Sequence, residues 1–514
     1  MLVVPIIVTP YVSRVLGVDG VGQYSFANSI VSYFLLFAVL GTTTYGQRTI
    51  GYEQQNVENR SRAFWEIFIF RLITAFITLG AYGIYVALAV KNGGLIIYLI
   101  LALNIFNVMV DISWFVQGME DFKRTATTSI VFRVLSVTSI FLFVKSPSDL
   151  WLYVLFTVGF SVLSNMFLWI YMPKYLCRVK GIKPFRDIKS IIQLFLPTIA
   201  IQIYTVLDKS MIGWFADGFT ENGYYEQAEK VVRMALTAVT ALGVVMIPRI
   251  SRKFKEGEIE QVNNYIYKSY RFVWMMAIPI MFGIIAVASI FVPIFFGEGY
   301  EKCIYLMPIL SILTIFVGLS HVTNMQYLIP VGKQNVIIVT SITGAVVNIV
   351  LNLCLIPWLA SIGAAIASVA AEFCVTAVGL GYIVKTKRYK LLPVLTCSWK
   401  YWIAGAVMTG LLFLIKIYLP VTVWALIVLI AAGALIYFIV LVIIRDKMLL
   451  EIISKGWQTV RSVFVRKRVK ETVEEGEQPM EIPEVDGEQP GVTDNPCVDG
   501  EPETSYETSP NNSD

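Results

Sequence analysis

The chain has 514 residues, of which 56% are hydrophobic and 15% charged, and its mean hydropathy is +0.68. A soluble domain usually carries about a quarter charged residues, so this composition excludes an ordinary soluble protein and predicts extensive contact with lipid. The formal net charge of +5 does not indicate nucleic-acid binding, because the basic residues gather in alternating loops, as membrane topology requires.

Long apolar stretches recur along the chain and predict how often it crosses a membrane. A bilayer core about 30 Å thick is spanned by about 20 apolar residues of helix. The stretches predict an all-α polytopic membrane protein with about fourteen transmembrane helices. We expect these helices at residues 1–13, 24–45, 64–90, 95–116, 126–144, 150–172, 190–214, 226–248, 270–296, 303–329, 335–357, 362–384, 399–419 and 421–444.

The first predicted helix is shorter than the others. It holds about a dozen apolar residues before Ser13 and Arg14, or about 18 Å of helix at 1.5 Å per residue. That length does not cross a membrane alone. We therefore expect the native chain to start upstream of Met1, or the first helix to be truncated.

Basic residues occupy every second loop, and cytoplasmic loops carry the excess of Lys and Arg in membrane proteins. The loop at 215–226 is acidic, whereas the loop before it is strongly basic. This pattern predicts a plasma-membrane protein of the bacterial cytoplasmic membrane with both termini in the cytoplasm. The basic residues of that preceding loop are Lys174, Arg178, Lys180, Lys183, Arg186 and Lys189.

An internal repeat appears when residues 22–48 are aligned with 223–249. Gly22, Tyr24, Ala27, Val31, Leu35 and Arg48 match Gly223, Tyr225, Ala228, Val232, Leu236 and Arg249. An even number of helices separates the copies, which predicts two six-helix lobes related by a pseudo-two-fold axis along the membrane normal, plus two C-terminal helices. A substrate site between the lobes follows from this arrangement.

The repeat and the composition together predict the domain organisation. The expected parts are an N-terminal lobe at 1–172, a basic cytoplasmic linker at 173–189, a C-terminal lobe at 190–384, helices 13 and 14 at 399–444, and a tail at 445–514. The tail is basic at first and then acidic and poor in aromatic residues, so we expect it to be cytoplasmic and its acidic part to be disordered.

Catalytic and metal-binding patterns are missing from the sequence. The six cysteines have no CxxC spacing, and His321 has no HExxH-type neighbour. No GxxxxGK[ST] loop for a nucleotide is present. We therefore expect no cofactor, no metal and no enzymatic activity.

Charged residues inside the predicted helices are the candidate functional residues. A charge at mid-bilayer costs about 2.5–3.5 kcal/mol, so each should face the bundle interior or a wet cavity. Glu229 and Arg233 are spaced i,i+4 and should pair, whereas Asp208 and Lys209 lie about 100° apart and each need a partner on another helix. The other candidates are Glu66, Arg71, Asp111, Arg133, Lys230 and Glu372.

Two interpretations of these charges stay open. Glu66, Arg71, Asp111 and Arg133 fit ion pairs that hold helices together within one lobe. By contrast, the cations near the lobe junction suit an anionic substrate, since arginine and lysine both bind phosphate well. These cations are Arg14, Lys209, Lys230 and Arg233.

Several strings resemble a known family. The opening Thr9–Gly17 (TPYVSRVLG) and the Gly-Gln-Tyr-Ser at 22–25 look like its first helix and following loop, and residues 111–120 (DISWFVQGME) are similar to its D-x-S-W-x-x-Q-G-x-E pattern. Residues 207–213 (LDKSMIG) resemble its second half, although residues 358–361 depart from its usual Tyr-Gly turn. The family is the polysaccharide-exporter branch of the multidrug/oligosaccharidyl-lipid/polysaccharide (MOP) superfamily.

The resemblance implies a flippase that translocates an undecaprenyl-pyrophosphate-linked oligosaccharide by alternating access. Because the sequence has no GxxxxGK[ST] loop for ATP, we expect transport to be coupled to an ion. It implies that Arg14, Lys209, Lys230 and Arg233 engage the pyrophosphate, with a polysaccharide polymerase and glycosyltransferases as partners and membrane lipids around it. For ion coupling or ion pairing the candidates are Asp111, Asp208, Glu372, Glu66, Arg71 and Arg133.

Three other functions compete with this interpretation. A cation-coupled multidrug efflux antiporter of the same superfamily would have a more acidic cavity with fewer buried cations. A membrane-embedded glycosyltransferase or polymerase would carry a large outer loop, yet the longest outer loop expected here has about a dozen residues. A structural scaffold would leave the charges within the membrane unexplained.

Overall fold

The computed structural model describes residues 3–90, 94–216, 218–386, 396, 398–454 and 458. Every regular element in these residues is helical. Contacts group the chain into Met1–Leu450 and Glu451–Asp514, and all the features below belong to the first unit. The predicted acidic tail lies outside the described residues.

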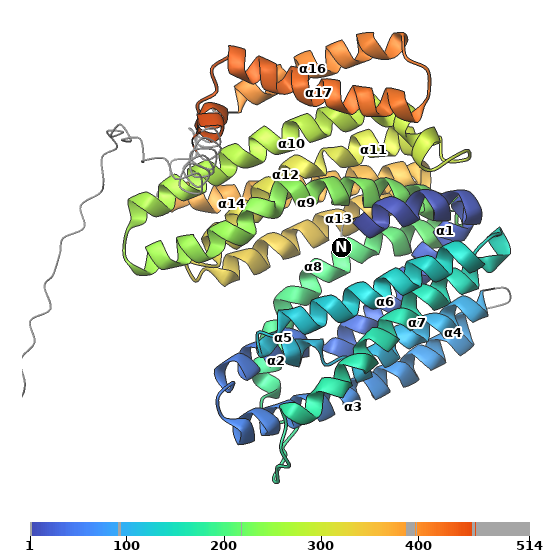
Figure 1. Ribbon diagram of the computed structural model, residues 1–514, viewed down its shortest axis with the longest axis vertical. Coiled ribbons are helices and arrows are strands. Elements are labelled where there is room, and N and C mark those ends of the chain that lie inside the picture. Colours follow the sequence, from blue (N-terminus) through green and yellow to red (C-terminus); the bar gives the residue numbers. More distant parts are fainter. Residues whose placement is uncertain are drawn as a thin grey trace, which may run out of the picture. The chain divides into compact units, whose positions relative to one another are not determined.

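The N-terminal lobe, defined here as α1 to α7, forms the lower group of helices in Figure 1. Asp111 and Ile112 interrupt the helix between α4 and α5, because Asp111 has an extended backbone conformation. The elements are α1 (Val3–Val39), α2 (Thr42–Tyr52), α3 (Val57–Ala89), α4 (Leu95–Val110), α5 (Ser113–Gly118), α6 (Phe122–Phe143), the 3₁₀ turn η1 (Pro147–Asp149), α7 (Leu150–Leu168) and η2 (Trp169–Lys174).

The C-terminal lobe, defined as α8 to α14, is followed by α16 and α17, which pack against each other and against α10 on the side away from the N-terminal lobe (Figure 1). One helix of this lobe ends in a π-helical stretch, η3 (Val322–Leu328). The other elements are α8 (Ile188–Phe215), α9 (Thr220–Lys255), α10 (Ile259–Phe295), α11 (Cys303–Ser311), α12 (Leu313–His321), α13 (Gln334–Leu359), α14 (Ser361–Lys385), α16 (Trp399–Ile417) and α17 (Val423–Ile443).

Twelve helical spans in the described residues are long and apolar enough to cross a membrane. The span Val4–Tyr52 contains the first two predicted helices, and α8, which is not among the twelve, corresponds to the seventh. Each of the predicted helices therefore has a helical counterpart, and the prediction of an all-α polytopic membrane protein is confirmed. The short first helix is the first arm of α1, which continues past a kink at Gly17.

The two lobes carry a glycine with positive φ at the same aligned position. Gly17 has φ 68° and Gly218 has φ 80°, a region that a residue with a Cβ rarely adopts. The two glycines match in the alignment that pairs 22–48 with 223–249. Each precedes a long helical segment, so the glycine with positive φ sets the direction in which that segment starts.

The aligned glycines Gly22 and Gly223 meet each other across the lobe junction. A Cβ built on Gly22 would lie 1.8 Å from the carbonyl oxygen of Phe219, and one built on Gly223 would lie 2.1 Å from that of Val18. Each glycine thus faces the residue four positions before the other, which is the reciprocal contact expected from two-fold symmetry. Small residues allow this approach, since lipid supplies no hydrophobic force to bring helices together.

Candidate functional site

The seam between the lobes, formed by α1 against α8 and α9, is held by polar side chains as well as by the glycines. The Gln227 amide donates a hydrogen bond of 2.9 Å to Ser13, and the Ser25 hydroxyl donates one of 2.9 Å to Glu226. Further along α1, Ser210 donates to Ser29 at 2.9 Å. Further contacts join Thr220 with Asp19, Tyr300 with the Ser13 carbonyl and Arg14 with the Ile294 carbonyl. The lobes are therefore in contact along α1 from its kink at Gly17, beside the loop that holds Gly218, to Ser29.

Next to this seam, four charged side chains of α8 and α9 form a row in which negative and positive groups alternate. The Lys209 ammonium lies 2.6 Å from a Glu226 carboxylate oxygen and 2.9 Å from one of Glu229, whose other oxygen lies 2.6 Å from Arg233. The predicted Glu229–Arg233 pair is confirmed, and Lys209 does find its partners on another helix. Glu226 was not among the residues predicted from the sequence, although its i,i+4 spacing to Lys230 was a signal for an interacting charge.

Asp208 is buried in a cage of neutral donors, away from the Lys209 side chain. Its carboxylate accepts hydrogen bonds from Tyr225 at 2.6 Å, Asn352 at 2.7 Å and Asn348 at 3.0 Å, and a further one from Ser368. These donors come from α9, α13 and α14, and the Asp208 side chain leaves α8. An ionised group taken so far out of water requires such donors. The Asp208 carboxylate therefore links four helices, α8, α9, α13 and α14, through hydrogen bonds.

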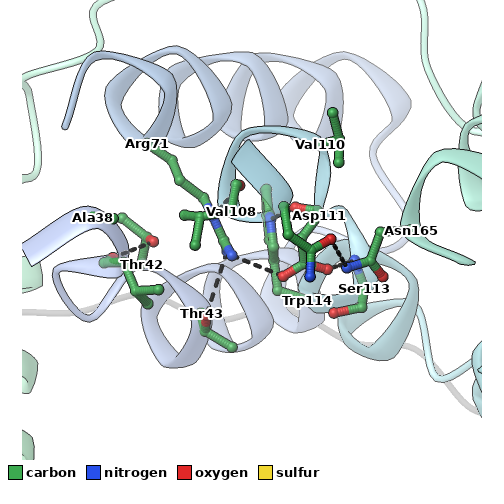
Figure 2. Close-up of polar contacts among 12 residues, drawn as sticks. Ala38, Thr42, Thr43, Arg71, Val108, Val110, Asp111, Ser113, Trp114 and Asn165 are labelled. Carbon is green, nitrogen blue, oxygen red and sulfur yellow. Dashed lines mark hydrogen bonds and ion pairs between the residues drawn. The ribbon is translucent and has the colours of Figure 1, made fainter. Parts of the chain in front are cut away.

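Asp111 and Arg71 form a buried ion pair inside the N-terminal lobe (Figure 2). Arg71 Nη2 lies 2.7 Å from Asp111 Oδ2, and the Arg71 side chain is 3% exposed. Arg71 also donates to the Val108 carbonyl at 3.0 Å, and Asp111 accepts from the Ser113 amide at 2.9 Å, which starts α5. The Trp114 indole is fully buried against Phe64. The D-x-S-W string thus builds the break between α4 and α5.

The other predicted pairing residues differ in their contacts. Glu66 accepts a hydrogen bond of 3.0 Å from the Lys183 amide, which ties the basic loop to α3. Glu372 on α14 is half-buried and interacts electrostatically with Arg233. Arg133 on α6 makes no hydrogen bond or ion pair with the residues that the structure describes.

Arg133 and Lys230 instead line one cavity of about 80 Å³ between the two lobes. Arg133 comes from α6 of the N-terminal lobe and Lys230 from α9 of the C-terminal lobe, while Val4, Val8 and Thr9 of α1 close the cavity. Lys230, like Arg133, makes no direct ion pair among the described residues, although the Glu226 carboxylate one helical turn before Lys230 interacts with it electrostatically. Two positive groups therefore face one space, whereas Lys209 and Arg233 are engaged by carboxylates. This arrangement can attract and hold an anionic group.

Known proteins share both the sequence and the architecture. Residues 1–254 match the family model described as Polysaccharide biosynthesis protein. A protein of Escherichia coli (strain K12), named as a candidate O-antigen transporter, is 22% identical over 393 residues, covering 74% of this chain and 93% of that protein.

Two solved structures share the fold. One is the lipid II flippase MurJ in an inward closed conformation, with a TM-score of 0.67 and 16% identity, covering 86% of this chain and 99% of that chain. The other is an inward-facing multidrug resistance MATE family transporter, with a TM-score of 0.52 and 12% identity, covering 80% of this chain and 98% of that chain. Residues 1–254 are therefore similar to the polysaccharide biosynthesis protein family, and the chain shares the fold of a lipid II flippase and of a multidrug transporter.

Proposed function

We propose that this protein flips an undecaprenyl-pyrophosphate-linked oligosaccharide from the cytoplasmic to the outer leaflet of the bacterial cytoplasmic membrane. The observation that carries the proposal is the pair of cations, Arg133 and Lys230, that face one cavity from opposite lobes. A pyrophosphate needs such cations, because a charge is expensive in the membrane unless an opposite charge compensates it. The match of residues 1–254 to the polysaccharide biosynthesis protein family and the name of the Escherichia coli relative support this cargo.

The seam suggests how the lobes work. The predicted topology puts the end of the seam near Gly17 and Gly218 at the outer face and both termini in the cytoplasm. The structure then represents a state closed to the outside, and export requires the seam to open. Cargo enters between the lobes, and the polyprenyl tail stays in lipid beside them.

The cargo can act on the transport cycle by binding the cations that carboxylates hold in this structure. Glu226 and Glu229 hold Lys209 and Arg233 while no cargo is bound. A pyrophosphate competes with these carboxylates for the same cations, and Arg14 lies at the seam itself. Binding the cargo thereby loosens the bonds that Glu226 makes to α1 and favours opening.

The protein carries out transport without catalysis in this proposal, and a polysaccharide polymerase takes over the cargo that glycosyltransferases have built.

A multidrug efflux antiporter is the alternative function, and it shares the fold. Unpaired cations in the cavity between the lobes would repel the cationic compounds that such a transporter exports, so the cargo is better explained as an anion.

Asp208 is the proposed coupling residue, because its carboxylate is buried among groups that hydrogen-bond to it without neutralising it. Asp208→Asn keeps the shape of the side chain and removes the charge. We expect export to fall to the level of a deletion while binding of the lipid-linked cargo is retained. Transport by reconstituted protein with and without a proton or sodium gradient measures this effect, and a variant that still responds to the gradient would contradict the assignment.

Deleting the protein from its host tests the function. We expect an undecaprenyl-pyrophosphate oligosaccharide to accumulate on the cytoplasmic leaflet, where mass spectrometry of extracted lipids identifies it. Unchanged lipid pools together with increased sensitivity to cationic dyes would contradict the proposal and favour efflux.

A further inference from the structure

A second cavity, of about 250 Å³, lies in the groove between α6 and α7 of the N-terminal lobe. We call it the polar groove, and its lining is rich in hydroxyl and amide groups. It includes Ser129, Arg133 and Ser136 of α6 and Ser161, Ser164 and Asn165 of α7. So many polar groups on spanning helices are unusual, because a hydroxyl or amide facing lipid tails has no partner there.

The groups of the groove are positioned and left open to a ligand. Asn107 of α4 donates a hydrogen bond of 3.2 Å to the Ser161 hydroxyl and accepts one of 2.9 Å from the Asn165 amide. These two bonds fix the positions of both side chains. Ser164 is 7% exposed, yet its hydroxyl makes no hydrogen bond with any described residue. Because Ser164 lines the cavity, its hydroxyl is free to donate to a ligand in the groove or to accept a hydrogen bond from it.

The polar groove lies next to the cavity that is lined by the two cations. Arg133, Ser136 and Thr157 line both spaces. From Thr157 to Asn165 the helix α7 rises about 12 Å at 1.5 Å per residue, which gives the groove the length of a short oligosaccharide. Phe132 and Phe160 add apolar ring faces among the polar groups, the combination by which a concave site fixes a ligand with many hydroxyls.

We propose that the polar groove binds the sugar portion of the cargo, with Arg133 at the junction between the sugars and the pyrophosphate. This inference rests on the proposed function, because it assigns a further part of the same cargo. Hydroxyl groups of a glycan both donate and accept, as do the serine and asparagine side chains of the groove. The guanidinium of Arg133 offers its N–H donors to the phosphate oxygens next to the first sugar.

Two lipids test the assignment on the purified full chain in lipid nanodiscs. One is undecaprenyl pyrophosphate without sugar, and the other is the glycosylated lipid isolated from the deletion strain. Filling the groove with the double change Ser161→Leu and Ser164→Leu should weaken binding of the glycosylated lipid by about tenfold. The same variant should bind the sugar-free lipid as the wild type does.

Milder and matched variants separate a binding effect from a folding effect. Ser164→Ala removes only the unpaired hydroxyl and should weaken binding of the glycosylated lipid by about threefold, with unchanged thermal stability. Thr343→Val on α13 changes a hydroxyl that bonds within its own helix and lines neither cavity, so both lipids should bind normally.

Each outcome decides the inference. If the groove variants bind both lipids as the wild type does, or lose both equally, the glycan assignment is overturned while the proposed function stands. If the wild-type protein binds neither lipid, the proposed function fails and the inference fails with it. A selective loss of the glycosylated lipid supports the assignment.

Discussion

Replacing Gly22 by Ala is expected to abolish most export while leaving the amount of protein in the membrane unchanged. The new Cβ would lie 1.8 Å from the Phe219 carbonyl oxygen, so the two lobes could not close at the seam. Overpacking of this kind costs about 1–3 kcal/mol, which corresponds to about a 5–150-fold shift between conformations. Polysaccharide at the cell surface and lipid-linked cargo in the membrane measure the effect together.

A matched glycine controls for changes within the helix itself. Gly80 of α3 has no heavy atom within 4 Å of its built Cβ, so Gly80→Ala should leave export intact. Alanine also favours a helix over glycine by about 1 kcal/mol, which means that any loss at Gly22 must come from the contact between lobes. Normal export by Gly22→Ala would show that the seam does not need to close.

Removing the Arg71 guanidinium is expected to destabilise the N-terminal lobe by about 3 kcal/mol, because it leaves the Asp111 carboxylate, whose side chain is only 16% exposed, without a counter-charge. The bond from Arg71 to the Val108 carbonyl is lost as well. Thermal unfolding in detergent and the steady-state amount of Arg71→Ala in the membrane measure the loss. Replacing both partners, as in Arg71→Met with Asp111→Asn, should restore much of it.

An exposed ion pair provides the control for this experiment. Arg62 and Glu58 lie 2.9 Å apart on α3, with side chains 36% and 67% exposed. Arg62→Ala should change stability by less than about 1 kcal/mol. If Arg71→Ala is as mild as Arg62→Ala, the pair with Asp111 does not hold α3 to α4. The D-x-S-W string would then need another explanation.

The helices and their symmetry were predictable because both depend on local signals. Apolar length marks each membrane-crossing helix, and the repeat is visible because Gly22 and Gly223 serve the same contact from both sides. The Glu229–Arg233 pair was also predictable, since residues four apart on a helix are neighbours. None of these inferences required knowledge of how distant helices pack.

The partners of the buried charges depend on packing between distant segments. The donors to Asp208 include Asn348 and Asn352, which lie about 140 residues further along the chain and are near it only in the folded lobe. Lys209 offered no sign that its partners would be two carboxylates of α9. The sequence favoured an ion pair within one lobe for Arg133, and only the structure brings this residue to the same cavity as Lys230.

Translocation of the glycosylated lipid by the purified protein is the decisive measurement of flippase activity. The lipid from the deletion strain is placed in liposomes with or without the protein, and a glycan-degrading enzyme is added outside. We expect the enzyme to reach only the outer-leaflet lipid in protein-free liposomes but nearly all of it when the wild-type protein is present, with Gly22→Ala close to the protein-free level. Equal protection of the inner leaflet with and without the wild-type protein would contradict a flippase.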